Sequence, residues 1–225
     1  MKNSNISLIS EFSDEVTRIE DYIREHIDAE GEYLHKLYRA THLHLLYPRM
    51  ASGHIQGRLL KMFVRMIQPR QVLEIGTYSG YSGLCIAEGL GDEGHLHTIE
   101  INEEQEDFTL PWFKNSDYAD KITMHIGDAL KIIPELNITF DMAFIDGDKR
   151  LYPEYYEMVL RYLSNGGYMF VDNTLWDGHV LDENPRESDL QTKGVKAFND
   201  LVASDDRVEK VILPVRDGLT IIRKK

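Results

Sequence analysis

Carboxylate and amide side chains stand at two points of this sequence where apolar runs end. Asp146 closes the run MAFID, while Asp172 closes the run YMFVD and is followed by Asn173. If the two runs are neighbouring parallel strands, their carboxyl ends meet and these side chains converge. Oxygen ligands with no Cys or His among them suit Mg²⁺, Mn²⁺ or Ca²⁺ and suit zinc poorly. The pattern predicts a hard-cation site made by Asp146, Asp172 and Asn173.

A cation at that place would change the acidity of a hydroxyl group bound to it. A phenol has a pKa of about 10 and is a weak nucleophile at neutral pH. Contact with a divalent cation lowers such a pKa, as it does for bound water. Lys149 is the expected base, provided that burial and the cation depress its own pKa. A second adjacent hydroxyl would fix the acceptor's orientation, so a catechol is the natural acceptor.

A glycine-containing turn, EIGTYSGYS, lies between an apolar run and a helical pattern. Gly76 and Gly80 allow a sharp turn and a close approach to a ligand, and the helix start presents free N–H groups. The dinucleotide pattern G-x-G-x-x-G is absent. The Glu74 carboxylate cannot bind a pyrophosphate but can pair with an ammonium group, while the Ser82 hydroxyl can donate a hydrogen bond to a carboxylate. The turn therefore favours S-adenosylmethionine over a dinucleotide.

Further positions extend the predicted cofactor site. Glu100 ends the next apolar run, about 20 residues after the glycine turn, where an acceptor for a ribose diol is expected. Asp128 and Ala129 follow the third run and are placed to reach an adenine. Asp128 is equally suited to capping the helix that begins there.

The elements that would position these residues alternate from Gln71 onward. Short apolar runs between helical patterns predict a parallel sheet with right-handed crossovers. The expected strands are VLEIG (72–76), LHTIE (96–100), ITMHI (122–126), MAFID (142–146) and YMFVD (168–172). The expected helices between and after them cover 79–89, 103–114, 128–136, 153–163 and 195–204.

Two strands then follow in direct succession, at 208–215 and 218–224. The Asp217-Gly218 pair between them is a tight hairpin signal, so the sheet is expected to end in an antiparallel pair. The segment 174–193 is long and polar, which indicates a binding loop or lid.

The remaining organisation is that of one domain spanning residues 1–225. Helical spacing before the sheet predicts extra N-terminal helices, including ones near 32–46 and 54–67. We expect residues 1–50 to form a helical cover and residues 51–225 to form a Rossmann-like core.

Composition narrows the class of protein. A net charge of −13 disfavours nucleic-acid binding. No apolar run reaches the length of about 18 residues that a membrane span requires, and no signal-peptide pattern is present. The single cysteine, Cys85, cannot form an internal disulfide and is expected to be a buried thiol, which fits the cytoplasm.

Histidine pairs offer a competing metal site. His42 and His44 are predicted to point to different faces of a helix. His95 and His97 share a strand face but have no third partner that the sequence identifies. We expect both pairs to be structural or surface groups.

With these residues in view, the chain resembles the cation-dependent catechol and caffeoyl-CoA-type O-methyltransferases of the class I methyltransferase superfamily. The likeness runs from about Met50 to the C-terminus, through VLEIGTYSGYS, HTIEIN, FIDGDKRLYPEYYE, LSNGGYMFVDNTLW and LPVRDGLTIIRK. It implies a Rossmann-like α/β fold with a seven-stranded, mostly parallel sheet and an antiparallel last strand. Helices would cover both faces of that sheet.

The resemblance also implies roles for single residues. Asp146, Asp172 and Asn173 match metal ligands, Lys149 matches the proposed base, and Trp176 matches an aromatic beside the acceptor, although a core Trp is the competing reading. The implied contacts to S-adenosylmethionine are Met50, Ala51, Glu74, Gly76, Ser82, Glu100, Asp128, Ala129 and Asp146. The first fifty residues would help to cover the acceptor site and form a homodimer surface.

The acceptor region departs from that pattern. The segment Gly178–Gln191 is acidic, and Arg186 is its only cation, which argues against a coenzyme A thioester. The expected acceptor is a small aromatic hydroxyl compound. Methylation of a hydroxylated uridine in tRNA is the main alternative, and the negative charge counts against it. An oxidoreductase and a non-catalytic cofactor-binding protein are the other classes considered.

Overall fold

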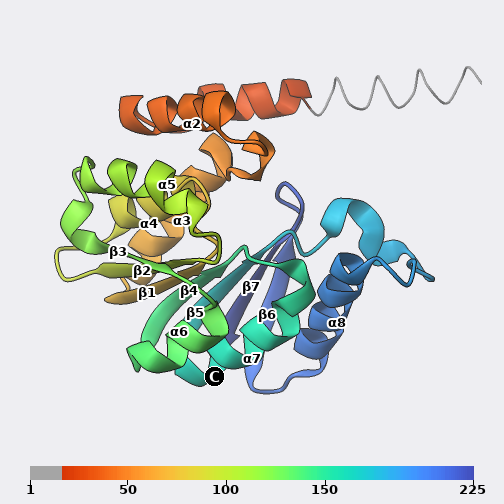
Figure 1. Ribbon diagram of the computed structural model, residues 1–225. Helices are drawn as coiled ribbons and strands as arrows, with labels where there is room; N and C mark the ends of the chain where they lie inside the picture. The colour runs from red at the N-terminus through yellow and green to blue at the C-terminus, as the bar shows by residue number, and fades with distance from the viewer. Residues whose placement is uncertain (1–16) are drawn as a thin grey trace, which may run out of the picture.

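The computed structural model describes residues 17–225, and its centre is a seven-stranded sheet (Figure 1). The strands are β1 (Gln71–Ile75), β2 (His95–Glu100), β3 (Ile122–Ile126), β4 (Phe140–Ile145), β5 (Leu163–Asp172), β6 (Val208–Leu213) and β7 (Leu219–Lys224). They lie in the order β3-β2-β1-β4-β5-β7-β6. The pairs from β3 to β5 are parallel, and β7 is antiparallel to both of its neighbours. The predicted sheet with a reversed last strand is confirmed.

Helices cover both faces of this sheet (Figure 1). One face carries α3 (Gly53–Ile67), α4 (Tyr81–Gly89) and α5 (Glu104–Lys114), and the other carries α6 (Ala129–Leu136), α7 (Tyr152–Tyr162) and α8 (Leu190–Ser204). Side chains alternate between the two layers because successive strand residues point to opposite faces. In β1, Val72 packs with Leu60 of α3, whereas Leu73 packs into the cluster that contains Val159 of α7. Burial on both faces is typical of a parallel sheet.

The chain order reverses between β1 and β4, which are neighbours although two strands separate them in sequence. From β1 the chain moves outward through β2 to β3, then returns to β4 and moves the other way. Ligands of open α/β sheets bind outside the carboxyl ends of strands at such a switch point. A ligand-binding site is therefore expected at the carboxyl ends of β1 and β4.

The N-terminal helices lie above the carboxyl ends of the strands (Figure 1). A helix through residues 17–26 is followed by α2 (Glu32–His44) and the 3₁₀ turn η1 (Pro48–Met50). Leu37 of α2 is fully buried in a cluster with Leu84 of α4, which docks this cover onto the core. The first part of the predicted 1–50 cover lies outside the described residues.

Two predicted boundaries were wrong. β5 begins at Leu163 instead of position 168, because the chain enters the sheet before an irregularity in its pairing with β4. α8 begins at Leu190 instead of position 195, since the Asp189 side chain accepts a hydrogen bond from the Thr192 N–H group and caps the helix. The segment expected to be one long loop is therefore shorter, and it contains the 3₁₀ turn η4 (Trp176–Leu181).

The predicted hairpin between β6 and β7 is present, and its turn includes Gly218 at φ 87°. None of the helices within residues 17–225 combines the length and the apolar character needed to cross a bilayer.

Candidate functional site

The ends of β1 and β4 meet at Gly76. The Asp146 N–H group donates to the Ile75 carbonyl at 2.9 Å, which joins the two loops where the strands end. Gly76 has φ 98°, and a Cβ atom there would lie 2.2 Å from the Asp146 carbonyl oxygen. Only glycine fits both the backbone angle and the space. The glycine that the sequence assigned to the cofactor turn is thus what allows Asp146 to stand at the cofactor side.

Glu74 is a fully buried carboxylate directly before this turn. Its Oε2 accepts a hydrogen bond from the Thr98 hydroxyl at 2.6 Å, while its Oε1 has no partner in hydrogen-bond geometry among the described residues. Burial raises the pKa of Glu74 to about 7, against the opposing influence of the Ser82 and Thr98 hydroxyls. A buried carboxylate oxygen without a partner fits the ammonium group of a ligand.

Glu100 ends β2 and braces the glycine turn. Its Oε2 accepts from the Tyr78 N–H group at 2.8 Å, and its Oε1 accepts from the Asn102 N–H group at 2.9 Å. Tyr78 has a left-handed backbone, with φ 46°. Glu100 therefore lies beside the predicted cofactor turn, and each oxygen retains capacity for another donor.

Asp128 and Ala129 stand at the next strand end, after β3. The Asp128 side chain accepts from the Leu130 N–H group at 3.0 Å, so it is the N-cap of α6. Ala129 is the buried first residue of that helix. Of the two readings left open for Asp128, the capping role is present, and the adenine contact stays a prediction.

Asp146 and Lys149 form an ion pair across the loop that follows β4. The Lys149 Nζ atom donates to the Asp146 Oδ1 atom at 2.6 Å, and Lys149 is buried. Burial alone would lower the pKa of Lys149, but the Asp146 carboxylate and the Tyr152 hydroxyl together outweigh it and raise that pKa. The depressed pKa that a base requires is absent from this arrangement. As it stands, Lys149 holds a proton and a charge.

Asp172 ends β5, which pairs directly with β4, so it lies next to Asp146 as predicted. It is only 2% exposed, and the Gln56 Nε2 atom donates to its Oδ2 atom at 2.8 Å. Burial and the neighbouring Asp146 charge raise the pKa of Asp172 to about 6. Asn173 follows with φ 58°. A buried Asp172 carboxylate that is repelled by the half-buried Asp146 and followed in sequence by the Asn173 amide fits a hard cation.

No cluster of three His, Cys, Asp or Glu side chains suited to a metal ion exists in residues 17–225. The candidate ligand set differs from such a cluster, because it consists of two carboxylates, Asp146 and Asp172, and the Asn173 amide.

Three residues beside this site escaped the sequence-based prediction. Gln56 contacts Asp172 from α3, and Arg216 contacts Gln56 from the β6–β7 turn. The Tyr152 hydroxyl donates to the Asp172 carbonyl oxygen at 2.9 Å. A polar Gln within an amphipathic helix start was the only local signal, since the contacts join residues far apart in the chain.

The remaining predicted site residues are Met50 and Ala51, assigned to the cofactor, and Trp176, assigned to the acceptor side. Met50 is exposed and Ala51 is buried, at the end of η1. Trp176 is half-buried against the core, and its Nε1 atom donates to the Thr192 hydroxyl at 3.1 Å. Trp176 is therefore packed against the core and α8, and its place beside the acceptor stays a prediction.

The histidines form a cluster on the edge strands. His97 Nδ1 lies 3.1 Å from His125 Nε2, and the His95 ring lies 4.9 Å from the His97 ring. The third partner that the sequence did not identify is His125, which parallel pairing of β2 with β3 brings alongside. Burial, followed by the neighbouring histidines, lowers the pKa of His97 to about 4, so this cluster is uncharged at neutral pH.

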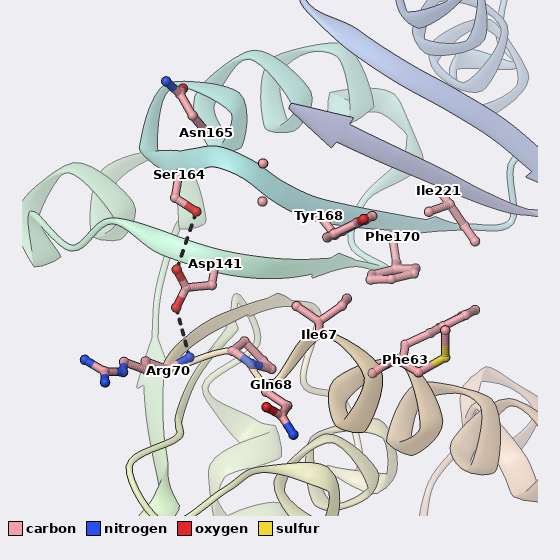
Figure 2. Close-up of a pocket in the computed structure, with 14 residues that line it drawn as sticks. Phe63, Ile67, Gln68, Arg70, Asp141, Ser164, Asn165, Tyr168, Phe170 and Ile221 are labelled. Carbon is pink, nitrogen blue, oxygen red and sulfur yellow. Dashed lines mark hydrogen bonds between the residues drawn. The ribbon is translucent and has the colours of Figure 1, made fainter. Parts of the chain in front are cut away.

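A hollow of about 710 Å³ lies at the opposite end of the sheet (Figure 2). Its walls include Phe63, Tyr168 and Phe170, and Asp141 at its rim accepts from the Arg70 N–H group at 2.9 Å. It is separate from the strand ends that carry Asp146 and Asp172, and none of the predicted site residues lines it.

The chain matches a family model described as O-methyltransferase over residues 24–225. Caffeoyl-CoA O-methyltransferase 2 of Zea mays is 35% identical over 185 residues, which cover 78% of this chain and 70% of that protein. Tricin synthase 2 of Oryza sativa subsp. japonica is 34% identical over 206 residues, covering 87% and 70%.

Solved structures agree with the sequence matches. An O-methyltransferase of Bacillus cereus in complex with SAH (S-adenosylhomocysteine) has a TM-score of 0.86 at 26% identity, covering 92% of this chain and 97% of that one. An O-methyltransferase of Streptomyces achromogenes involved in tomaymycin synthesis, in complex with SAM (S-adenosylmethionine), has a TM-score of 0.85 at 30% identity. That match covers 92% of this chain and 96% of the other.

Proposed function

The chain belongs to the O-methyltransferase family, with relatives of the caffeoyl-CoA type, and on that premise we propose a divalent-metal-dependent reaction on a small catechol-like or phenolic acceptor. S-adenosylmethionine is the methyl donor, since similar structures contain it or its demethylated product. The observation that carries the proposed metal dependence is the buried Asp172 carboxylate beside the half-buried Asp146, whose mutual repulsion a hard cation would relieve.

The donor would be held by the residues at the ends of β1, β2 and β3. The unpartnered Oε1 atom of Glu74 accepts from its ammonium group, with Ser82 and the start of α4 opposite its carboxylate. Glu100 is placed for the ribose diol. Ala51, Gly76, Asp128 and Ala129 would surround the remainder, and Met50 would border it on the exposed side.

The metal would be held by Asp146, Asp172 and Asn173. When bound, a divalent cation supplies the charge that lowers the pKa of a phenolic acceptor. Lys149 holds a proton on Nζ while it is paired with Asp146, so it can serve as the base only after that ion pair is loosened. Trp176 orients the acceptor ring, because its own indole is fixed by the bond to Thr192.

The acceptor surface suits a compound without a polyphosphate. Apolar side chains are exposed there, including Leu46, Tyr47 and Leu181. Arg186 is the only cation of the acidic segment Gly178–Gln191. The lysines that follow in α8 are engaged, since Lys193 donates to the Glu187 carbonyl and Lys196 to the Asp182 carbonyl. A coenzyme A phosphate would therefore have a single cationic partner, Arg186, in this segment. We therefore place the acceptor among free catechols and phenols.

The alternative acceptor, a hydroxylated uridine in tRNA, is not favoured. The net charge of −13 opposes a phosphate backbone, and the relatives reported above include an enzyme named for caffeoyl-CoA. A cytoplasmic location and a homodimer remain proposals from the sequence.

The decisive experiment is a methyl-transfer assay with labelled S-adenosylmethionine. A panel of free catechols, monophenols, caffeoyl-CoA and bulk tRNA is tested in buffer, in EDTA, and in EDTA followed by excess Mg²⁺ or Mn²⁺. We expect transfer to a vicinal diol that EDTA abolishes and the metal restores. Transfer that EDTA leaves unchanged would contradict metal dependence, and transfer to tRNA alone would contradict the acceptor class.

A further inference from the structure

The turn between β6 and β7 is fixed against the loop that contains Asn173. The Thr174 N–H group donates to the Gly218 carbonyl at 3.1 Å, and the Leu175 N–H group donates to the Asp217 carbonyl at 2.9 Å. A Cβ atom on Gly218 would lie 2.5 Å from the Leu175 side chain. The turn and the loop after β5 therefore hold each other in place, although about forty residues of chain lie between them.

Arg216 reaches from this turn to the start of α3. Its Nη1 atom donates to the Ser52 carbonyl and to the Gln56 side-chain oxygen. Gln56 is only 2% exposed, and its Nε2 atom donates to Asp172 Oδ2 at 2.8 Å. Because Arg216 can only donate, it fixes which end of the Gln56 amide is the oxygen, and the NH₂ group must face Asp172.

The effect on Asp172 is to orient its carboxylate. The hydrogen bond from Gln56 takes the Oδ2 atom, and no other side chain among the described residues donates to this carboxylate. The Oδ1 atom is left available. A buried carboxylate that is held through one oxygen presents its other oxygen, with both lone pairs free, most readily to a cation.

Asp217 acts in the same way on Asn173. The Asn173 side chain faces the Asp217 carboxylate and favours its charged form, and that carboxylate also accepts from the Asp177 N–H group. An ionised carboxylate only accepts, so Asn173 donates its Nδ2 hydrogen and its Oδ1 atom points elsewhere. The amide oxygen, the only atom of Asn173's side chain that can bind a hard cation, is thereby presented.

We propose that the β6–β7 turn is the outer support of the metal site, with Arg216 acting through Gln56 on Asp172 and Asp217 acting on Asn173. All three are positioning residues. This proposal rests on the metal dependence proposed above. Outer partners of this kind typically change metal affinity by about 10- to 100-fold when they are removed.

The test measures Mn²⁺ binding directly, without acceptor and without turnover, by the loss of the free-ion signal in electron paramagnetic resonance. Gln56→Met keeps the side-chain length and removes the amide, and Asp217→Ala removes the acceptor for Asn173. We expect each to weaken Mn²⁺ binding about tenfold. Calorimetric affinity for S-adenosylmethionine should stay that of the wild type, which also shows that the variants are folded.

Arg216→Gly is the cleanest variant of the outermost residue. Arg216 has φ 50°, a left-handed angle that glycine adopts without strain, so the substitution removes the guanidinium group while suiting the turn. We expect Arg216→Gly to weaken Mn²⁺ binding, as Gln56→Met does, but by a smaller factor. Because glycine suits the backbone angle of this turn, the variant is expected to fold, and it keeps the proposal testable if Gln56→Met does not fold.

Matched controls separate positioning from general damage. Gln71→Met alters a glutamine at the opposite end of the sheet, and Arg223→Met removes an arginine of β7 whose partner is the exposed Glu209. Both should bind Mn²⁺ like the wild type. Asp217→Asn keeps an oxygen that can accept from Asn173 and should recover most of the affinity lost in Asp217→Ala.

The outcomes are distinguishable. Wild-type affinity in Gln56→Met, Asp217→Ala and Arg216→Gly would overturn the positioning role while leaving the metal site in place. Equal losses in the control variants would overturn it as well. A wild-type protein that binds no Mn²⁺ or Mg²⁺ would overturn the proposed metal dependence, and the positioning role with it.

Discussion

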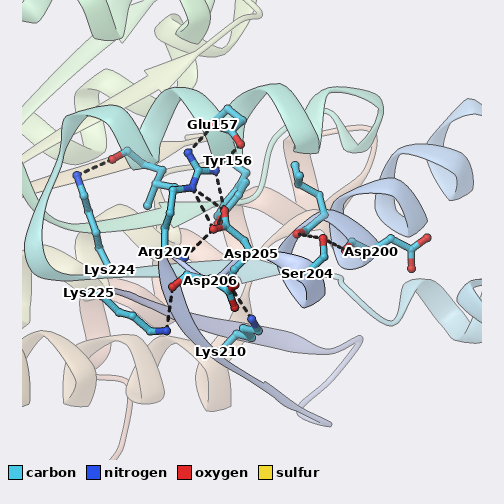
Figure 3. Close-up of polar contacts among 12 residues, drawn as sticks. Tyr156, Glu157, Asp200, Ser204, Asp205, Asp206, Arg207, Lys210, Lys224 and Lys225 are labelled. Carbon is cyan, nitrogen blue, oxygen red and sulfur yellow. Dashed lines mark hydrogen bonds and ion pairs between the residues drawn. The ribbon is translucent and has the colours of Figure 1, made fainter.

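Buried carboxylates at the two ends of the sheet differ in how many hydrogen-bond donors they have and in the direction of their pKa shifts. At the amino end of the parallel strands, Asp205 accepts from the Tyr156 hydroxyl at 2.7 Å, from the Arg207 N–H group at 2.8 Å and from the Arg207 side chain (Figure 3). These donors, with those of Arg207 outweighing burial, hold the pKa of Asp205 well below its usual range. At the carboxyl end, Asp172 has one donated hydrogen bond, and its pKa is raised to about 6.

The difference separates a carboxylate that stabilises the fold from one that is kept for a ligand. Burying a charge without enough donors costs free energy, so a protein that needed only stability would fill such a position with an apolar side chain. Glu74 and Asp172 are both under-supplied with donors, and both lie where the strands β1 and β5 end at the candidate site. A shortage of donors around buried carboxylates at the switch point of the sheet indicates function.

Asp172→Ala should give the largest effect and would sharpen this comparison most. We expect methyl transfer to fall to background, because the variant lacks a proposed metal ligand, while affinity for S-adenosylmethionine changes little. Single-turnover assays and calorimetric titration measure the two quantities. A comparable loss of cofactor binding would show that Asp172 does more than hold a cation.

Lys149→Ala should lower the maximal rate by about 100-fold, the lower range for a positioned acid–base group, with a smaller change in acceptor KM. The rate profile of the wild type should rise with pH as Lys149 loses its proton, and this rise should be missing in the variant. An identical pH profile in both proteins would remove Lys149 from proton transfer and leave it as the counter-charge of Asp146.

Asp205→Asn tests the other half of the comparison. We expect it to destabilise the fold by about 2 kcal/mol, the scale of a hydrogen bond to a charged group, after allowing for the partial exposure of Arg207. Urea unfolding measures the change. Methyl transfer at a temperature where the variant is folded should equal that of the wild type, and reduced turnover there would break the distinction between the two carboxylates.

Cofactor affinity should depend on pH through Glu74. Its pKa of about 7 in the free protein lies above the usual 4.5. Between these two pH values Glu74 is therefore mostly protonated and has no negative charge to pair with an ammonium group. Affinity for S-adenosylmethionine should therefore rise with pH up to about 7, and fall about tenfold per pH unit below it.

The contribution of Glu74 to the stability of the free protein has the opposite sign, since it is present at low pH and is lost as pH rises through about 7. Calorimetric titration between pH 5 and 8 checks the binding curve, with Glu74→Gln as the control. This variant should bind S-adenosylmethionine weakly with a flat pH dependence. A wild-type affinity that is flat over the same range would contradict the role of Glu74.

The sequence by itself determined the elements and the residues at their ends. Apolar runs of strand length between helical patterns placed the strand β3 at 122–126 without error, and the Asp217-Gly218 pair located the last hairpin. These signals are local, because side-chain periodicity reports which face of an element is buried. Asp146, Asp172 and Asn173 were found for the same reason, since strand ends can be recognised before the order of the strands is known.

Only the tertiary structure decided which residues distant in the sequence contact one another. Gln56 meets Asp172, Arg216 meets Gln56, and His125 meets His97 through strand order and register, which no local pattern reports. It also set the charge state of Lys149, because Asp146 and Tyr152 together outweigh the burial that the sequence argument relied on. A pKa is the sum of burial and nearby charges, and both depend on contacts between residues that are distant in the chain.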